Sequence, residues 1–178
     1  MLLRTILLLF LVTAFQNLSG QKVFIGGEEG ARMLTWNDFK GMPDNSSPFF
    51  AFTAWNTKYK FSSVRFEGEK AILNGFEMTL EFDAKNSWKK KGKETDALLK
   101  HEQGHFDVGL LYLQEVLSTV ASTSFSRTGF KEEIQKLIKG IHKKYVDMGD
   151  QYDKETDHSK EKDEQEKWNV FFGERVNR

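Results

Sequence analysis

The chain has 178 residues and no cysteine, and its 26 lysines and arginines balance 26 acidic residues. A chain of this length is expected to form one domain around one core. Without cysteine it has no disulfides, and any metal must be held by imidazole and carboxylate groups. The even charge balance argues against a nucleic-acid partner.

The first twenty residues have the pattern of a secretory signal peptide. Arg4 precedes an apolar run, residues 6–11, which continues more weakly to Phe15 and gives way to the sequence QNLSG. This order is typical of export signals, and the run is shorter than the roughly 20 apolar residues of a membrane-spanning helix. We therefore expect residues 1–20 to be removed and residues 21–178 to form a single exported domain with no remaining membrane span.

The first half of the remaining chain predicts strands. Residues 49–61 and 71–82 are aromatic-rich and partly alternating, and they follow a loop at residues 42–48 that holds both prolines. In residues 76–82, FEMTLEF, the apolar side chains alternate with Glu77, Thr79 and Glu81. Strict alternation of this kind predicts a half-buried strand.

The second half predicts helices. A long amphipathic helix is expected over residues 95–120, with Thr95 as its N-cap and a polar face formed by Lys100, Gln103, Asp107 and Gln114. A second helix follows from Phe130 to about Tyr145, then a turn over residues 147–160, then a third helix around Trp168. Strands first and helices afterwards predict an α+β domain, with a small antiparallel sheet packed on the long helix and two C-terminal helices.

The long helix carries the sequence LLKHEQGHFD, residues 98–107. His101 and His105 lie about 40° apart around the axis and can reach one ion, while Glu102 is rotated by about 100°. This H-E-x-x-H pattern supplies two zinc ligands and a general base; the alternative is a pair of packed or surface histidines. Gly104 costs about 1 kcal/mol in a helix, which indicates a group packed closely against this face. Asp107 falls on the far side.

A catalytic zinc takes a third protein ligand. His142 only borders the apolar stripe of its helix, and we interpret it as a surface histidine. The sequence YDKETDHS, residues 152–159, is expected between two helices and offers Asp153 and His158. A neutral histidine at the start of a helix suits zinc best, so His158 is favoured and Asp153 is its strongest rival. The alternative is a solvated acidic turn.

Three stretches resemble a family of bacterial proteins that is catalogued as a domain of unknown function and predicted to be secreted zinc-dependent proteases. They are LTWNDFKG (34–41), SWKKKGKETDALLKHEQGHFD (87–107) and YDKETDHSKEKDEQEKW (152–168). The last resembles the family pattern Y-D-x-x-T-x-H-G followed by glutamine and tryptophan, with Ser159 in place of the usual glycine. The residues that match this pattern are Tyr152, Asp153, Thr156, His158, Gln165 and Trp168.

This resemblance implies a periplasmic or extracellular, zincin-like peptidase with His101, His105 and His158 as Zn²⁺ ligands and Glu102 as base, acting on a peptide or protein. Zincin-like enzymes bind substrate along a sheet edge, for which residues 76–82 are the candidate. Tyr152 either donates to the oxyanion or, the favoured alternative, packs in the core. Two other functions stay open: an exported non-catalytic binding protein stabilised by metal, and a zinc hydrolase acting on another amide or ester. The oligomeric state is left unknown.

Overall fold

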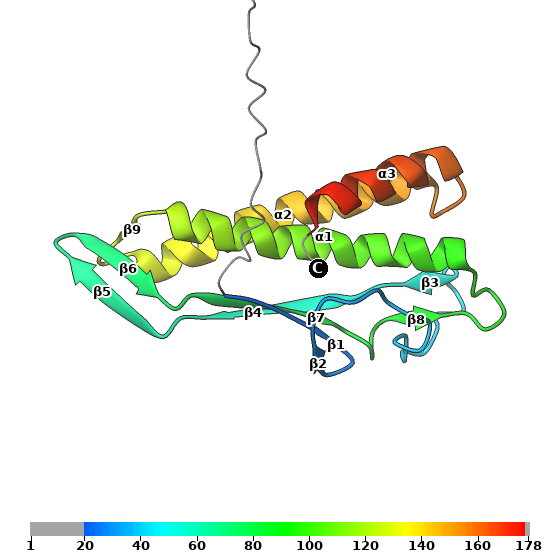
Figure 1. Cartoon of the computed structure of the whole chain (residues 1–178), viewed down its shortest axis with the longest axis horizontal. Coiled ribbons are helices and arrows are strands. Elements are labelled where there is room, and N and C mark those ends of the chain that lie inside the picture. Colours follow the sequence, from blue (N-terminus) through cyan, green and yellow to red (C-terminus); the bar gives the residue numbers. More distant parts are fainter. Residues whose placement is uncertain (1–19, 177–178) are drawn as a thin grey trace, which may run out of the picture.

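The computed structural model describes residues 20–176 (Figure 1). The predicted signal peptide, apart from Gly20, lies outside these residues. The elements in chain order are β1 (Gln21–Ile25), β2 (Glu28–Glu29), β3 (Ala51–Phe52), β4 (Trp55–Lys60), β5 (Ser63–Glu67), β6 (Lys70–Asn74), β7 (Glu77–Phe82), β8 (Trp88–Lys89), α1 (Asp96–Ser122), β9 (Phe125–Ser126), α2 (Phe130–Thr156) and α3 (Lys162–Arg175).

The strands form three small sheets. The largest has the order β2-β1-β7-β4, and the others are β3-β8 and β5-β6-β9. All pairs are antiparallel except β1 with β7. The predicted α+β class is confirmed, and so is the strand predicted at residues 76–82, which is β7. Its proposed role as a substrate-binding edge is wrong, because β1 and β4 hydrogen-bond to its two sides.

Helix α1 is the middle layer, with the largest sheet on one side and α2 and α3 on the other (Figure 1). Leu80 and Phe82 of β7 pack with Phe106 and Leu110 of α1, and all four side chains are buried. Gly109 lets the helix approach the sheet, since a Cβ there would lie 3.1 Å from the Trp55 ring. The core between β7 and α1 therefore fixes the position of the helix that carries the two histidines.

The expected polar face of α1 is partly wrong, because Gln103 and Asp107 are buried. Gln103 accepts a hydrogen bond from the Leu34 N–H (2.7 Å) and donates one to Asp107 (2.8 Å). Helical phase correctly places these residues away from the histidines. It cannot show that other segments cover this side as well, so α1 is enclosed on both faces.

Helix α2 is longer than predicted. Residues 147–156 continue the helix instead of forming a turn, and only Asp157–Glu161 separate α2 from α3. Tyr145, Tyr152 and Thr156 are buried at helical spacing, which explains why the helix persists through a polar sequence. Asp153 therefore lies on a helix and is held more rigidly than the sequence indicated. None of the helices within residues 20–176 is long and apolar enough to cross a membrane.

Candidate metal centre

His101 and His105 project side by side from the first turns of α1. The helix begins as predicted, with the Thr95 side chain accepting a hydrogen bond from the Leu98 N–H (3.1 Å). The Nε2 atoms of the two histidines lie 3.3 Å apart, and their rings are nearly perpendicular. His101 is 2% exposed, whereas His105 is only partly buried. The pair thus has one ring fixed in the core and one that borders solvent.

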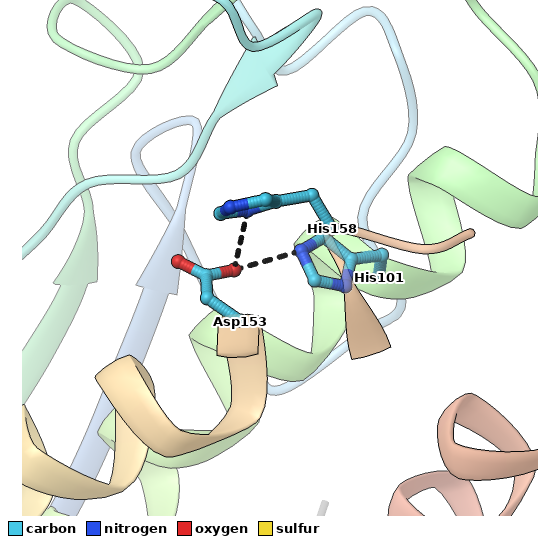
Figure 2. Close-up of side chains that lie close together, drawn as sticks. All are labelled: His101, Asp153 and His158. Atoms are coloured by element: carbon cyan, nitrogen blue, oxygen red, sulfur yellow. Dashed lines mark hydrogen bonds and ion pairs between the residues drawn. The ribbon is translucent and has the colours of Figure 1, made fainter. Parts of the chain in front are cut away.

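Asp153 of α2 faces His101 and His158 in Figure 2, and its carboxylate also lies next to His105. Its Oδ1 atom is 3.1 Å from His101 Nε2 and 3.0 Å from His105 Nε2. The Nδ1 atom of His158 is 3.1 Å from the same oxygen. The donor atoms of His101, Asp153 and His158 all lie within 4.8 Å of one another, a spacing that a single metal ion can bridge. The sequence left Asp153 and His158 as alternatives, and the structure brings both together with the two helical histidines.

The predicted setting of His158 is wrong, although its position near the cluster agrees with the prediction. It follows the C-terminus of α2 instead of beginning α3, so the argument from a helix N-terminus does not apply. Asp157, His158 and Ser159 have φ values of 41°, 52° and 77°. Three successive left-handed residues without glycine are strained. This turn directs the His158 ring back toward Asp153, where Phe49 packs against it with the ring centroids 4.3 Å apart.

His142 lies apart from the cluster, on the exposed side of α2. Its ring packs edge-on against Trp55 and Tyr112. The prediction that this histidine is a surface residue is confirmed.

Gln165 of α3 orients His101. Its Oε1 atom lies 3.1 Å from His101 Nδ1, and its amide donates to the Tyr152 hydroxyl (2.7 Å). A hydrogen bond to Nδ1–H fixes the tautomer that leaves the Nε2 lone pair free for a metal, as is usual for metal-binding histidines. Sequence reasoning gave Gln165 no role beyond the family pattern, because nothing local predicts that α3 folds back onto α1.

Tyr152 is a packing residue, and the hydrogen bonds of its hydroxyl are made within the core. It is fully buried, stacks on His101 with the centroids 4.7 Å apart, and donates to the His101 carbonyl (3.1 Å). This agrees with the favoured alternative and removes the oxyanion role. It also explains Gly104, because a Cβ there would lie 2.6 Å from Tyr152 Cζ. The predicted close packing against this face of α1 is confirmed.

Glu102 lies beside the cluster and is only 3% exposed. Its Oε2 accepts a hydrogen bond from the Thr53 hydroxyl (2.7 Å). Burial raises the pKa of this carboxyl above its ordinary value, opposed by the nearby His105 and by the bond from Thr53. A carboxylate whose pKa is raised is suited to accept and return a proton near neutral pH. Thr53 comes from the strand region, and no sequence pattern connected it with Glu102.

Charges within the cluster stabilise one another. Burial raises the pKa of Asp153, but its bonds to His101 and His105 outweigh that effect and leave the pKa well below the ordinary carboxyl value. Burial lowers the pKa of His105, but Asp153 and Glu102 outweigh it and leave the pKa above 6.5. In the metal-free chain, the protonated form of His105 thus balances the charge of Asp153.

The cluster opens into a cavity of about 480 Å³. One wall is α1, and another is the segment Pro48–Thr53, which includes β3. Among the strands of residues 20–176, β3 pairs only with β8, so within this part of the chain one of its edges is unpaired. The free sheet edge beside the candidate metal centre is therefore β3, and not β7 as predicted.

A comparison with known protein families matches residues 25–159 to the family described as bacterial protein of unknown function (DUF922). The matched region holds His101, Glu102, His105, Asp153 and His158, whereas Gln165 lies beyond it. Neither the curated proteins nor the solved structures gave a match.

Proposed function

Since the family match covers residues 25–159 of 178, the chain belongs to the DUF922 family of bacterial proteins, and we propose that it is an exported zinc-dependent metallopeptidase. The observation that carries the proposal is the convergence of His101, His105 and Asp153 beside a buried Glu102, at the edge of a cavity. Export is supported by the signal-peptide pattern of residues 1–20.

The donor atoms fit zinc. Zinc is held by imidazole and carboxylate groups at about 2.0–2.2 Å, which places tetrahedral ligand atoms roughly 3.3 Å apart. The separations among His101 Nε2, His105 Nε2 and Asp153 Oδ1 are 3.1, 3.0 and 3.3 Å. These three groups come from two helices that pack directly on one another. We assign them as the zinc ligands.

His158 supplies a fourth donor. Its Nδ1 lies 3.1 Å from Asp153 Oδ1, but it belongs to a strained turn and not to a helix. We therefore propose that His158 would bind the ion more weakly than Asp153. Replacing Asp153 with alanine should remove zinc, whereas His158→Ala should retain it at lower affinity. The reverse result, measured by elemental analysis, would assign the third ligand to His158.

Glu102 has the role of general base. Bound zinc would supply a water with a pKa of about 7 and would polarise the substrate carbonyl. Glu102 accepts the proton from the attacking water and passes it to the leaving nitrogen. The Thr53 hydroxyl, bonded to Oε2, holds the carboxylate in one orientation. The Trp55 indole N–H donates to the His105 carbonyl (3.1 Å) and so holds the turn of α1 that carries Glu102 and His105.

Strand β3 is suited to bind the substrate backbone. Ala51 and Phe52 pair with Lys89 and Trp88, and the Lys90 N–H donates to the Phe50 carbonyl (2.7 Å). Bonded residues alternate along an antiparallel pair, so the N–H and C=O groups of Ala51 point away from β8. An extended peptide can add to this edge as a further strand. Its main chain would then run past Glu102.

Two other functions remain as alternatives. A non-catalytic binding protein would use the metal only as a structural link between α1 and α2, and it would have no need for a buried carboxylate beside the ligands. A hydrolase acting on another amide or ester would share the same groups.

The experiment is to load the exported chain with zinc, measure its zinc content, and incubate it with casein and a peptide library. We expect one zinc per chain and cleaved peptide bonds. Stoichiometric zinc without cleavage would instead support the binding protein. Hydrolysis of ester or non-peptide amide substrates with intact peptides would support the third function.

A further inference from the structure

Resting on the proposed function, we propose that the cavity beside Glu102 selects substrates with a bulky apolar side chain next to the cleaved bond and discriminates against lysine and arginine. The apolar part of the cavity lining, and not the metal ligands that share the cavity, makes this selection. The cavity volume of about 480 Å³ lies within the range of roughly 300–1,000 Å³ that is usual for ligand sites.

The apolar lining comes from two elements that approach each other across the cavity. From α1 comes Leu98, one turn before Glu102, which is buried. From the opposite wall come Phe49, Phe50 and Phe52, all of which line the cavity. Leu98 is on the same helical face as Glu102 and His105, so an apolar group held against it lies within one helical turn of the general base.

These phenylalanines are unusually exposed. Phe49 is 39%, Phe50 45% and Phe52 48% accessible. Scattered single apolar side chains are normal on a protein surface, but three within four residues that line one cavity form a patch. Such a patch is stabilised by a partner that removes it from water. An apolar side chain of the substrate is the partner that this lining fits.

Desolvation gives the second part of the selectivity. Lys160 lines the cavity and is paired with Asp157 (3.1 Å), and the Lys93 ammonium lies over the Phe50 ring, 4.9 Å from its centre. A lysine or arginine entering the cavity would lose its hydration against the phenylalanines. Neutral apolar side chains do not carry this cost. The discrimination therefore follows from the cost of desolvation as well as from fit.

The first test is the cleavage profile of the zinc-loaded chain on a peptide library, read by mass spectrometry. We expect leucine, isoleucine, phenylalanine and methionine to be enriched on one side of the cleaved bond and lysine and arginine to be depleted there. Phe50→Ala should lower kcat/KM for a leucine substrate by about tenfold or more and leave a glycine substrate nearly unchanged. Phe66→Ala removes an equally exposed phenylalanine of β5 and is the matched control.

The second test separates this inference from the proposed function. Zinc-loaded protein is titrated with dipeptide hydroxamates that differ only in carrying leucine, glycine or lysine, and binding is measured by calorimetry. We expect the leucine compound to bind most tightly, and we expect Phe50→Ala but not Phe66→Ala to weaken its binding. This result supports the apolar selectivity even if no peptide is cleaved. In that case only the peptidase proposal fails. Equal binding of all three compounds, or cleavage with no side-chain preference, overturns the inference while leaving the metal centre and its base intact.

Discussion

Replacing Gly104 with alanine tests whether Tyr152 fixes the metal-binding face of α1. In an ordinary helix interior this change stabilises a protein by about 1 kcal/mol, because alanine restricts the unfolded chain and favours the helix. Here the added Cβ would lie 2.6 Å from Tyr152 Cζ and 2.8 Å from Cε1. Tyr152 is fully buried and bonded to both His101 and Gln165, so its ring has little room to move.

Overpacking of this kind costs about 1–3 kcal/mol, which equals or exceeds the gain in helix propensity. We expect Gly104→Ala to lower the free energy of unfolding by up to about 2 kcal/mol. The matched control is Gly140→Ala on the exposed side of α2, where an added Cβ meets nothing within 4 Å. That change should raise the free energy of unfolding by about 0.5–1 kcal/mol.

The assay is urea unfolding of the metal-free variants, followed by circular dichroism. Because Tyr152 stacks on His101, Gly104→Ala should also weaken zinc binding, whereas Gly140→Ala should leave it unchanged. If Gly104→Ala were as stabilising as Gly140→Ala and bound zinc normally, Tyr152 would not be a rigid support of the site.

Three further predictions concern the surroundings of the cluster. Ser159→Gly should raise the free energy of unfolding by about 1 kcal/mol, because Ser159 has a φ of 77° that suits glycine; no gain in urea unfolding would show that the turn is unstrained. Gln165→Leu should weaken zinc binding by about 10–100-fold in a chelator competition. Gln165→Glu keeps a hydrogen-bond acceptor for His101 and should retain zinc binding. Equal losses of affinity in the two variants would exclude a role of Gln165 in orienting His101. The metal-free protein should lose stability as the pH rises through the pKa of His105, because this pKa is raised above 6.5 and the imidazole is charged, and so paired with Asp153, only below its pKa. Asp153→Asn should make the free energy of unfolding less dependent on pH. An unchanged pH dependence in this variant would contradict the pairing.

The sequence was informative where a single element carries the signal. The N-cap at Thr95, the phase of His101 and His105 and the close packing at Gly104 all follow from helical geometry within α1. The strand at residues 76–82 likewise follows from its alternation, as β7.

Most features that depend on contacts between distant segments were not predicted; the approach of Asp153 and His158 to the two helical histidines is the exception. The alternation in β7 indicates a strand but contains no information about its neighbours, so its central place in the sheet was missed. Thr53 and Gln165 touch Glu102 and His101 across 49 and 64 residues of chain. The predicted end of α2, near Tyr145, was wrong for a different reason. Tyr145, Tyr152 and Thr156 continue its buried stripe, and that signal was present in a stretch interpreted as a polar turn.

The most direct test of the central claim compares peptide hydrolysis by the zinc-loaded wild-type chain and by zinc-loaded Glu102→Gln. Glutamine keeps the shape of the side chain but cannot accept the proton, and the loss of a general base lowers rates by about 10²–10⁴-fold. The zinc-loaded wild-type chain should cleave peptides, and the variant should bind zinc normally and lose hydrolysis by at least the lower figure. A variant that hydrolyses peptides at the wild-type rate, or a zinc-loaded wild-type chain that cleaves none, would contradict the assignment of this site as a metallopeptidase centre.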